Sequence, residues 1–220
     1  MKKIIVLAFV FLFSTAIAVK AQYLKFPSRD LYDTEVMAAS LNAHRQMYER
    51  VSQIMHAVQP YRKQQYEYYR DGKYREAIEL CLEVYKQYVH YAFDNKAISD
   101  MEVLAGDCAV KLCLYEAAID LYQIAQKAGE DGVPSKLSQI FNLKMNDART
   151  SYRNSNYSAL WNDVSIALKT GWENGECYFY YGVCYEKSNK LADAKKMYKL
   201  ARKKNYSPAV IALQELKKKK

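Results

Sequence analysis

The chain has 220 residues, of which 50% are hydrophobic and 26% are charged, and it contains 7 glycines and 4 prolines. This composition excludes a disordered tail, a collagen-like chain and an all-β protein rich in glycine and proline. The formal net charge is +9, and 21 tyrosines contrast with 2 tryptophans. The sequence therefore predicts a folded protein in which tyrosine is unusually abundant.

Residues 1–21 have the three parts of a secretory signal peptide. Lys2 and Lys3 precede an apolar run that ends at Val19, and small residues lead up to Ala21. The run is shorter than the stretch of about 18 apolar residues that predicts a membrane span. We expect cleavage after Ala21, with an uncleaved anchor as the alternative, and export to the periplasm or the medium. No cysteine precedes Cys81, so a lipoprotein anchor is not expected.

The predicted export also changes the charge. Loss of the three lysines in the leader lowers the net charge from +9 to +6, and the four lysines of residues 217–220 supply most of the remainder. The folded body is then only mildly basic, which disfavours nucleic acid as a partner.

The five cysteines do not have the spacing of a disulfide framework. On one helix, Cys177 and Cys184 would lie roughly 10 Å apart, and a disulfide tolerates about 7 Å between its Cα atoms. No Cys-x-x-Cys or Cys–His spacing indicates a metal site. We expect buried thiols at Cys81, Cys108, Cys113, Cys177 and Cys184, with one long-range disulfide or a metal or redox site as alternatives.

After an irregular lead-in over residues 22–32, the sequence predicts an amphipathic helix from about Thr34 to Ala57. Its apolar residues recur at steps of three and four, and the stripe needs a surface to cover it. We expect this helix, within residues 22–57, to cap the helical region that follows; a coiled coil or dimer contact is the alternative. His44 is expected to be half-buried in the stripe, which consists of Met37, Leu41, His44, Tyr48, Val51, Met55 and Val58.

Four helix pairs with one shared pattern are predicted over residues 58–208. Small and aromatic residues recur at helical spacing on both sides of a short polar turn, which indicates two closely packed antiparallel helices. The last pair spans Cys177–Lys187 and Leu191–Lys203, and three of the turns are Asp71–Tyr74, Asn154–Asn156 and Ser188–Lys190. The recurring residues are Tyr68, Ala77, Cys81 and Val84; Gly106, Ala109, Tyr115, Ala118, Tyr122 and Ala125; Ala148, Tyr157, Leu160, Val164 and Ala167; and Gly182, Tyr185, Ala194, Tyr198 and Ala201.

Two insertions lengthen this array. Seven residues are added after the first pair, and we expect a continuous helix from Tyr74 to Phe93 to absorb them. Eight are added after the second pair, where Gly129–Pro134 is expected to be a loop and Ser135 the N-cap of a lengthened helix. A final helix is predicted over Ser207–Leu216, so that residues 209–220 hold a helix end and a lysine-rich tail.

The pattern resembles the tetratricopeptide repeat (TPR), a helix-turn-helix unit of about 34 residues. The match is strongest from Gly182 to Ala201 and from Gly106 to Ala125, whereas Leu160 stands where the family prefers alanine. The resemblance implies an all-α fold, a right-handed α-solenoid of about four TPR-like units over residues 58–208.

The resemblance also implies a concave groove, lined by the first helix of each unit, that binds peptides or protein segments. Aromatic and arginine side chains are common at binding hot spots, and arginines would favour an acidic or C-terminal carboxylate ligand. Ordinary solvated helix faces are the alternative. The candidate groove residues are Arg62, Tyr66, Tyr69, Arg70, Met145, Arg149, Tyr152, Arg153, Phe179 and Val183, together with Val103, Asp107, Val110, Lys111, Glu186 and Lys187.

No GxGxxG, GxxxxGK[ST], GxSxG or HExxH pattern occurs, so we expect no enzyme activity, cofactor or metal. We expect a non-catalytic exported scaffold that binds a protein or peptide, for instance within a bacterial envelope assembly. The alternative is a peripheral surface protein that binds anionic lipid or polysaccharide through its basic end, at Arg202–Lys204 and Lys217–Lys220. The same lysines also fit a merely solvated tail.

Overall fold

The computed structural model describes residues 34–218, with side chains from residue 39 onward. The predicted leader (1–21), the lead-in (22–32), Lys219 and Lys220 lie outside the described residues. The chain divides into two units, Met1–Tyr48 and Glu49–Lys220.

The helix α2 (Thr34–Ala57) begins and ends where the sequence predicts. Its last turns belong to the second unit, where Val51, Ile54 and Val58 are buried in a core cluster. In the first unit Leu41 and His44 are exposed, so the expected half-buried environment of His44 is wrong. The apolar stripe is covered only where later helices pack on it.

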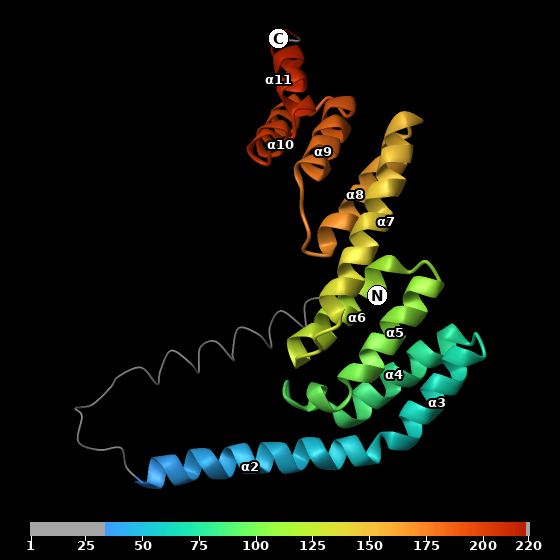
Figure 1. Ribbon diagram of the computed structural model, residues 1–220, viewed down its shortest axis with the longest axis vertical. Helices are drawn as coiled ribbons and strands as arrows, with labels where there is room; N and C mark the ends of the chain where they lie inside the picture. Colours follow the sequence, from blue (N-terminus) through green and yellow to red (C-terminus); the bar gives the residue numbers. More distant parts are fainter. Residues whose placement is uncertain (1–33, 219–220) are drawn as a thin grey trace. The chain divides into compact units, whose positions relative to one another are not determined.

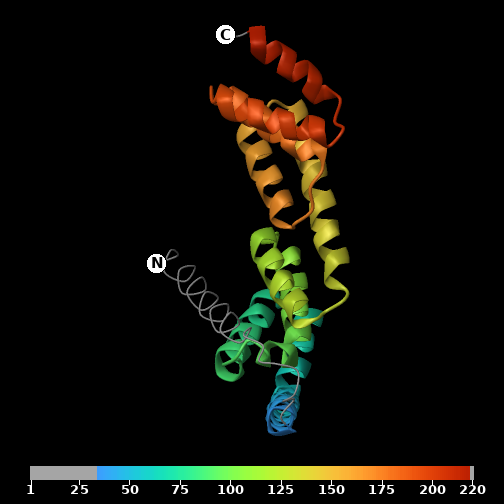
Figure 2. The ribbon, with the colours of Figure 1, turned by 90° about the vertical axis from the view of Figure 1, so that its left-hand side faces the viewer.

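The described residues from Gln59 onward form successive helix pairs, and every regular element between residues 34 and 218 is helical. This confirms the predicted all-α class. The two helices of each pair lie side by side in both views (Figures 1 and 2). The pairs are α3 (Gln59–Arg70) with α4 (Tyr74–Tyr88), α5 (Ser99–Lys111) with α6 (Tyr115–Ala128), α7 (Val133–Arg153) with α8 (Tyr157–Lys169), and α9 (Gly175–Lys187) with α10 (Leu191–Lys203). A last helix, α11 (Pro208–Lys218), packs on α10.

The turns inside the four pairs share one backbone conformation. One residue of each turn is left-handed, with φ between 56° and 74°: Gly72, Cys113, Ser155 and Asn189. In the third pair, Ser155 N–H donates to the Tyr152 carbonyl at 3.0 Å and Asn156 N–H to the Ser151 carbonyl at 2.9 Å. The same two bonds recur in the other three turns. This is the Schellman helix end, and it returns the chain antiparallel after a short link.

Close approach of a glycine and a tyrosine joins the helices of two pairs. A Cβ atom added at Gly106 would lie 2.4 Å from the Tyr122 ring, and one added at Gly182 would lie 2.4 Å from the Tyr198 ring. Both rings are buried. The predicted packing of small residues against aromatic ones is therefore confirmed at these two pairs.

Each pair packs mainly on the next pair along the chain. Contacts join α4 to α5, α6 to α7 and α8 to α9. The buried apolar residues form three clusters that succeed one another: from the end of α2 to α5, from α5 to α8, and from α7 to α11. The core of the second unit is thus built from contacts between elements that are near neighbours in the sequence.

The predicted continuous helix from Tyr74 to Phe93 is wrong. The helix α4 ends at Tyr88, and the added residues form a loop and the 3-10 helix η1 (Asp94–Ala97). Asp94 holds this loop, because its carboxylate accepts backbone hydrogen bonds from His90 and Tyr91 and two from the Arg50 guanidinium. Burial raises the pKa of Asp94, but these hydrogen bonds together outweigh it and lower that pKa below its usual value.

The predicted N-cap at Ser135 is also wrong. The helix α7 begins at Val133, after Gly132, and Pro134 lies in its first turn. Proline is favoured there because its missing N–H has no partner in a helix start and its fixed φ suits the helix. The predicted lengthening of this helix is confirmed, since α7 has 21 residues.

All five cysteines lie in the described part of the chain and are free thiols. Cys81, Cys108, Cys177 and Cys184 are buried, as expected, but Cys113 is exposed. Its exposure follows from its place in a turn, at a left-handed φ of 58°.

The structure also contains no helix, within residues 34–218, whose length and hydropathy would let it cross a membrane.

Candidate binding pocket

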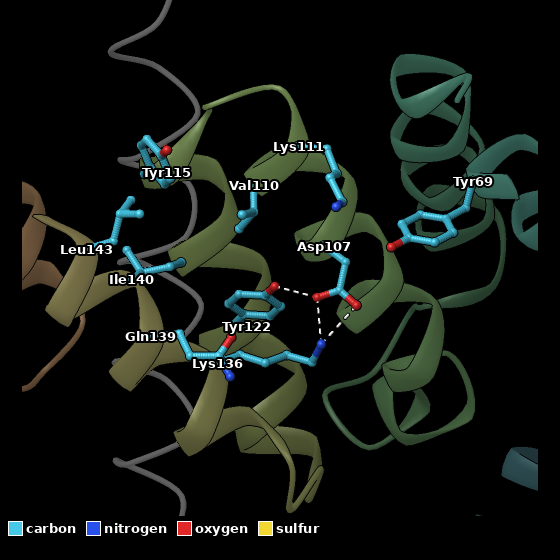
Figure 3. A pocket seen from close by; sticks show the side chains of 10 residues that line it. All are labelled: Tyr69, Asp107, Val110, Lys111, Tyr115, Tyr122, Lys136, Gln139, Ile140 and Leu143. Atoms are coloured by element: carbon cyan, nitrogen blue, oxygen red, sulfur yellow. Dashed lines mark hydrogen bonds and ion pairs between the residues drawn. The ribbon is translucent and has the colours of Figure 1, made fainter. Parts of the chain in front are cut away.

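A pocket of about 360 Å³ lies where α3, α5, α6 and α7 come together (Figure 3). Three of these helices are the first members of their pairs. The lining residues are Tyr69 of α3; Asp107, Val110 and Lys111 of α5; Tyr115 and Tyr122 of α6; and Lys136, Gln139, Ile140 and Leu143 of α7. The pocket is therefore lined mainly by the helices to which the TPR resemblance assigns the groove.

Helical periodicity places these side chains. Asp107, Val110 and Lys111 are three and four residues apart, so they share one face of α5. On α7 the lining residues recur at the same steps from Lys136 to Leu143. The sequence thus provides two helix faces that each combine polar and apolar groups.

An ion pair and a phenol form the polar side of the pocket. Lys136 Nζ lies 2.6 Å from Asp107 Oδ1 and 2.8 Å from Oδ2, and the Tyr122 hydroxyl donates to Oδ1 at 2.6 Å. Tyr122 reaches Asp107 because its ring packs on Gly106, the residue before Asp107. Burial, and then the Asp107 carboxylate, raise the pKa of Tyr122, so its hydroxyl remains a neutral donor.

Several polar groups of the pocket have no partner among the described residues. Lys111 is exposed and its ammonium group makes no ion pair there. The amide of Gln139 and the hydroxyl of Tyr69 likewise make no hydrogen bond within residues 34–218, although the Tyr69 ring stands edge-on to Tyr74 at 5.7 Å. Since Lys136 balances Asp107, the pocket keeps one uncompensated positive charge.

The structure brings together some of the predicted groove residues. Tyr69 of α3 and the α5 residues Asp107, Val110 and Lys111 line one pocket. Tyr66 is 61% exposed and Arg70 is exposed, although Arg70 approaches Asp71 at 3.4 Å. Val103, by contrast, packs against a core cluster.

Three candidates on α7 and α9 are core residues, so their assignment to an open groove is wrong. Met145 is 1% exposed, Val183 7% and Phe179 8%. The reason is that α9 packs against α10, α8 and α7, and so buries most of its circumference. The groove prediction assumed that each first helix packs through one face and leaves the opposite face exposed.

Two of the arginines expected to attract a ligand are engaged inside the protein. Arg62 donates to Asp100 at 2.8 Å and to the backbone carbonyls of Met55 and Ala97. Arg149 makes a bidentate pair with Glu176, at 2.7 and 2.9 Å. Their positive charges are therefore balanced within the protein. These two arginines no longer support the prediction of an acidic ligand.

The remaining candidates have mixed surroundings. Tyr152 is partly exposed and its ring lies 6.0 Å from that of Phe179, while Arg153 is exposed. Glu186 accepts a hydrogen bond from the buried Tyr198 hydroxyl, and the Lys187 ammonium lies 5.0 Å above the Tyr157 ring. None of these four lines the pocket.

The sequence reasoning missed the contribution of α7 to the pocket. Lys136, Gln139 and Ile140 lie in the added N-terminal turns of that helix, before Phe141, where the predicted third repeat unit begins. Their spacing of three and four residues, counted from Lys136, was a signal that could have found them.

The described residues contain no group of three or more His, Cys, Asp or Glu side chains placed to hold a metal ion.

The chain matches no known protein-family model and no curated protein sequence. Function must therefore be inferred from the geometry of the chain itself.

Proposed function

We propose that the chain is a non-catalytic, exported helical-repeat scaffold that binds a segment of another protein. The pocket between α3, α5, α6 and α7 is the observation that supports this proposal. It combines apolar side chains with unsatisfied polar groups, which is the usual composition of a binding site.

The proposal includes a right-handed α-solenoid of TPR type. Support comes from the four turns, each of which contains one residue with a left-handed φ, and from the two glycine–tyrosine contacts at equivalent positions. Successive pairs that pack mainly on their neighbours are what a repeat protein requires. In such an array the first helices of consecutive pairs would line one side, and they also line the pocket.

The pocket chemistry favours an acidic segment with an apolar side chain. Lys111 offers an uncompensated ammonium, and Tyr69 and Gln139 offer further donors. Ile140 and Leu143 provide an apolar wall near Gln139, on the other side of the view from Lys111 and Tyr69 (Figure 3). An extended peptide that carries a carboxylate next to an aliphatic residue would offer a partner to the polar donors and an apolar side chain to the wall.

A peptide-display selection against the purified chain tests the proposal. We expect enrichment of peptides that carry Asp or Glu beside an aliphatic residue. Lys111→Glu should weaken their binding at least about tenfold, because it replaces attraction by repulsion at close range. Lys86→Glu, the same change at an exposed lysine of α4 outside the pocket, is the matched control.

A second substitution should act in the opposite direction. Asp107→Asn leaves the positive charge of Lys136 unbalanced while keeping an oxygen that accepts from Tyr122. It should tighten the selected acidic peptides several-fold. A selection without enrichment, or peptides equally sensitive to Lys86→Glu and Lys111→Glu, would rule out this pocket as the binding site.

A further inference from the structure

The excess positive charge of the protein is confined to one end. Residues 186–220 hold twelve lysines and arginines but three acidic residues, so their net charge of +9 equals that of the whole chain. Residues 1–185 are balanced. Within the described residues this cationic segment consists of the end of α9, then α10 and α11 with their flanking turns.

On α10 the charge is concentrated on the side that faces solvent. Lys196, Lys199 and Lys203 recur at steps of three and four and are exposed, together with Leu200. The opposite side of the helix buries Ala194, Tyr198 and Ala201 in the core. The structure thus separates a packed apolar side from a cationic outer side.

Most of these cations are not neutralised within the protein. Lys199, Arg202 and Lys203 have no acidic partner among residues 34–218, whereas Lys196 pairs with Asp193 at 3.2 Å. Like charges four residues apart, as at Lys199 and Lys203, destabilise a helix. The arrangement therefore costs stability, and an anionic partner would remove that cost.

The same two helices also carry exposed aliphatic side chains. Leu200 of α10 is partly exposed, and on α11 Val210 is partly exposed and Ile211 is 60% exposed. The other side of α11 is buried through Ala209 and Leu216. A surface that mixes lysines with aliphatic residues suits the interface of a bilayer, where charge meets the headgroups and apolar side chains enter the acyl boundary.

We propose that the exposed sides of α10 and α11 form a docking surface for anionic phospholipid. The charge selects the headgroups, and Leu200, Val210 and Ile211 distinguish a bilayer from a polysaccharide, which offers no hydrocarbon to receive them. This surface involves none of the residues of the pocket, so substitutions on it leave the pocket residues unchanged.

Vesicle cosedimentation of the full chain tests the proposal. We expect binding to phosphatidylcholine vesicles that contain phosphatidylglycerol, little binding to pure phosphatidylcholine, and weakening with added salt. Each cation near an anionic membrane contributes about fivefold to partitioning. The triple variant Lys199→Gln, Arg202→Gln, Lys203→Gln should therefore bind about 100-fold more weakly.

The control is a triple variant with Lys63→Gln, Lys86→Gln and Lys96→Gln, three exposed lysines far from α10 in the sequence. All variants share the same N-terminus, so any contribution from residues 1–33 is equal among them. Circular dichroism and thermal melting verify that each variant is folded. Equal losses in the two triple variants would overturn the assignment to α10.

Two further outcomes decide the nature of the ligand. Leu200→Ser with Ile211→Ser should reduce the binding that persists at high salt. If this variant binds as well as the wild type, or if the chain binds dextran sulfate but not vesicles, the lipid proposal is overturned. No binding to anionic vesicles at any salt concentration also overturns it.

Discussion

Gly182 packs directly against the ring of Tyr198, so closely that an added methyl group would lie 2.4 Å from two of its carbon atoms. The Tyr198 hydroxyl then donates to Glu186, one turn further along the same helix as Gly182. Gly106 and Tyr122 repeat the contact, with the hydroxyl donating to Asp107. The two helix pairs thus use the same packing solution.

Gly182→Ala should therefore lower the free energy of unfolding by about 1–3 kcal/mol, because the buried ring has to move. Urea denaturation measures the change. The cost should be much smaller when Tyr198→Val is already present, since the ring that clashes is then absent. Gly132→Ala, at a glycine with free space around it, should change the free energy by about 0.5 kcal/mol or less. An equal cost in both tyrosine and valine backgrounds would contradict the packing argument.

The left-handed turns predict a stabilising substitution. Ser155 has a φ of 56°, and glycine adopts this conformation without the steric cost of a side chain. Ser155→Gly should raise the free energy of unfolding by about 0.5–1 kcal/mol. Asn154→Gly, next to it but at a φ of −84°, is the control and should destabilise, because there glycine only adds entropy to the unfolded chain. Chemical denaturation of both variants should give opposite signs.

A buried carboxyl group predicts a dependence of stability on pH. Asn95 Nδ2 donates to Glu102 Oε2 at 3.0 Å, while Glu102 Oε1 and Asn95 Oδ1 are buried without a partner. Burial, aided by Asp100 and Glu130 and opposed by the Asn95 hydrogen bond, raises the pKa of Glu102 from 4.5 to about 8. A proton on Oε1 would let it donate to Asn95 Oδ1.

Because the folded-state pKa is raised, the stabilisation by protonated Glu102 is complete below pH 4.5 and is lost as the pH rises to about 8. This group alone should lower the free energy of unfolding by about 1.4 kcal/mol per pH unit in that window. Glu102→Gln keeps an oxygen that accepts from Asn95 Nδ2 but has no titrating proton, so its stability curve should be flatter. Parallel curves for the two proteins would show that Glu102 does not titrate in this way.

The cysteines predict a selective thiol reaction. Cys113 is exposed in its turn, whereas burial raises the pKa of the Cys177 and Cys184 thiols to about 11 and shields them from reagents. A thiol reagent should therefore modify Cys113 rapidly in the folded protein and the other four only on unfolding. Cys113→Ser should abolish the rapid phase. A reductant that lowered the melting temperature would instead reveal a disulfide.

The sequence predicted the helices of the array well because their packing is local. The glycine–tyrosine spacing and the short polar turns located α9 and α10 within two residues of their observed bounds, and the predicted turn Asn154–Asn156 lies directly before α8. In these pairs each helix folds against its immediate neighbour, so the pattern of small and aromatic residues carries most of the information.

The insertions were less predictable. The residues from Val89 to Phe93 are compatible with a helix by composition, but Asp94 and Arg50, 44 residues apart, anchor them as a loop. The start of α7 was missed for a similar reason, because Pro134 is compatible both with the end of a loop and with the first turn of a helix. In both places a distant partner or a positional preference overrode the local pattern.

By itself, the sequence determined an all-α protein of paired helices, its turns and most of its buried cysteines, because these follow from periodicity and from contacts between neighbours. Only the tertiary structure decided that Arg62 and Arg149 are neutralised and that Phe179 and Val183 are buried. It also decided that Lys111, near the Asp107–Lys136 pair, has no acidic partner among residues 34–218. The physical reason is that charge balance and exposure depend on every helix packed around a residue. The periodicity of one helix predicts only which of its faces is apolar.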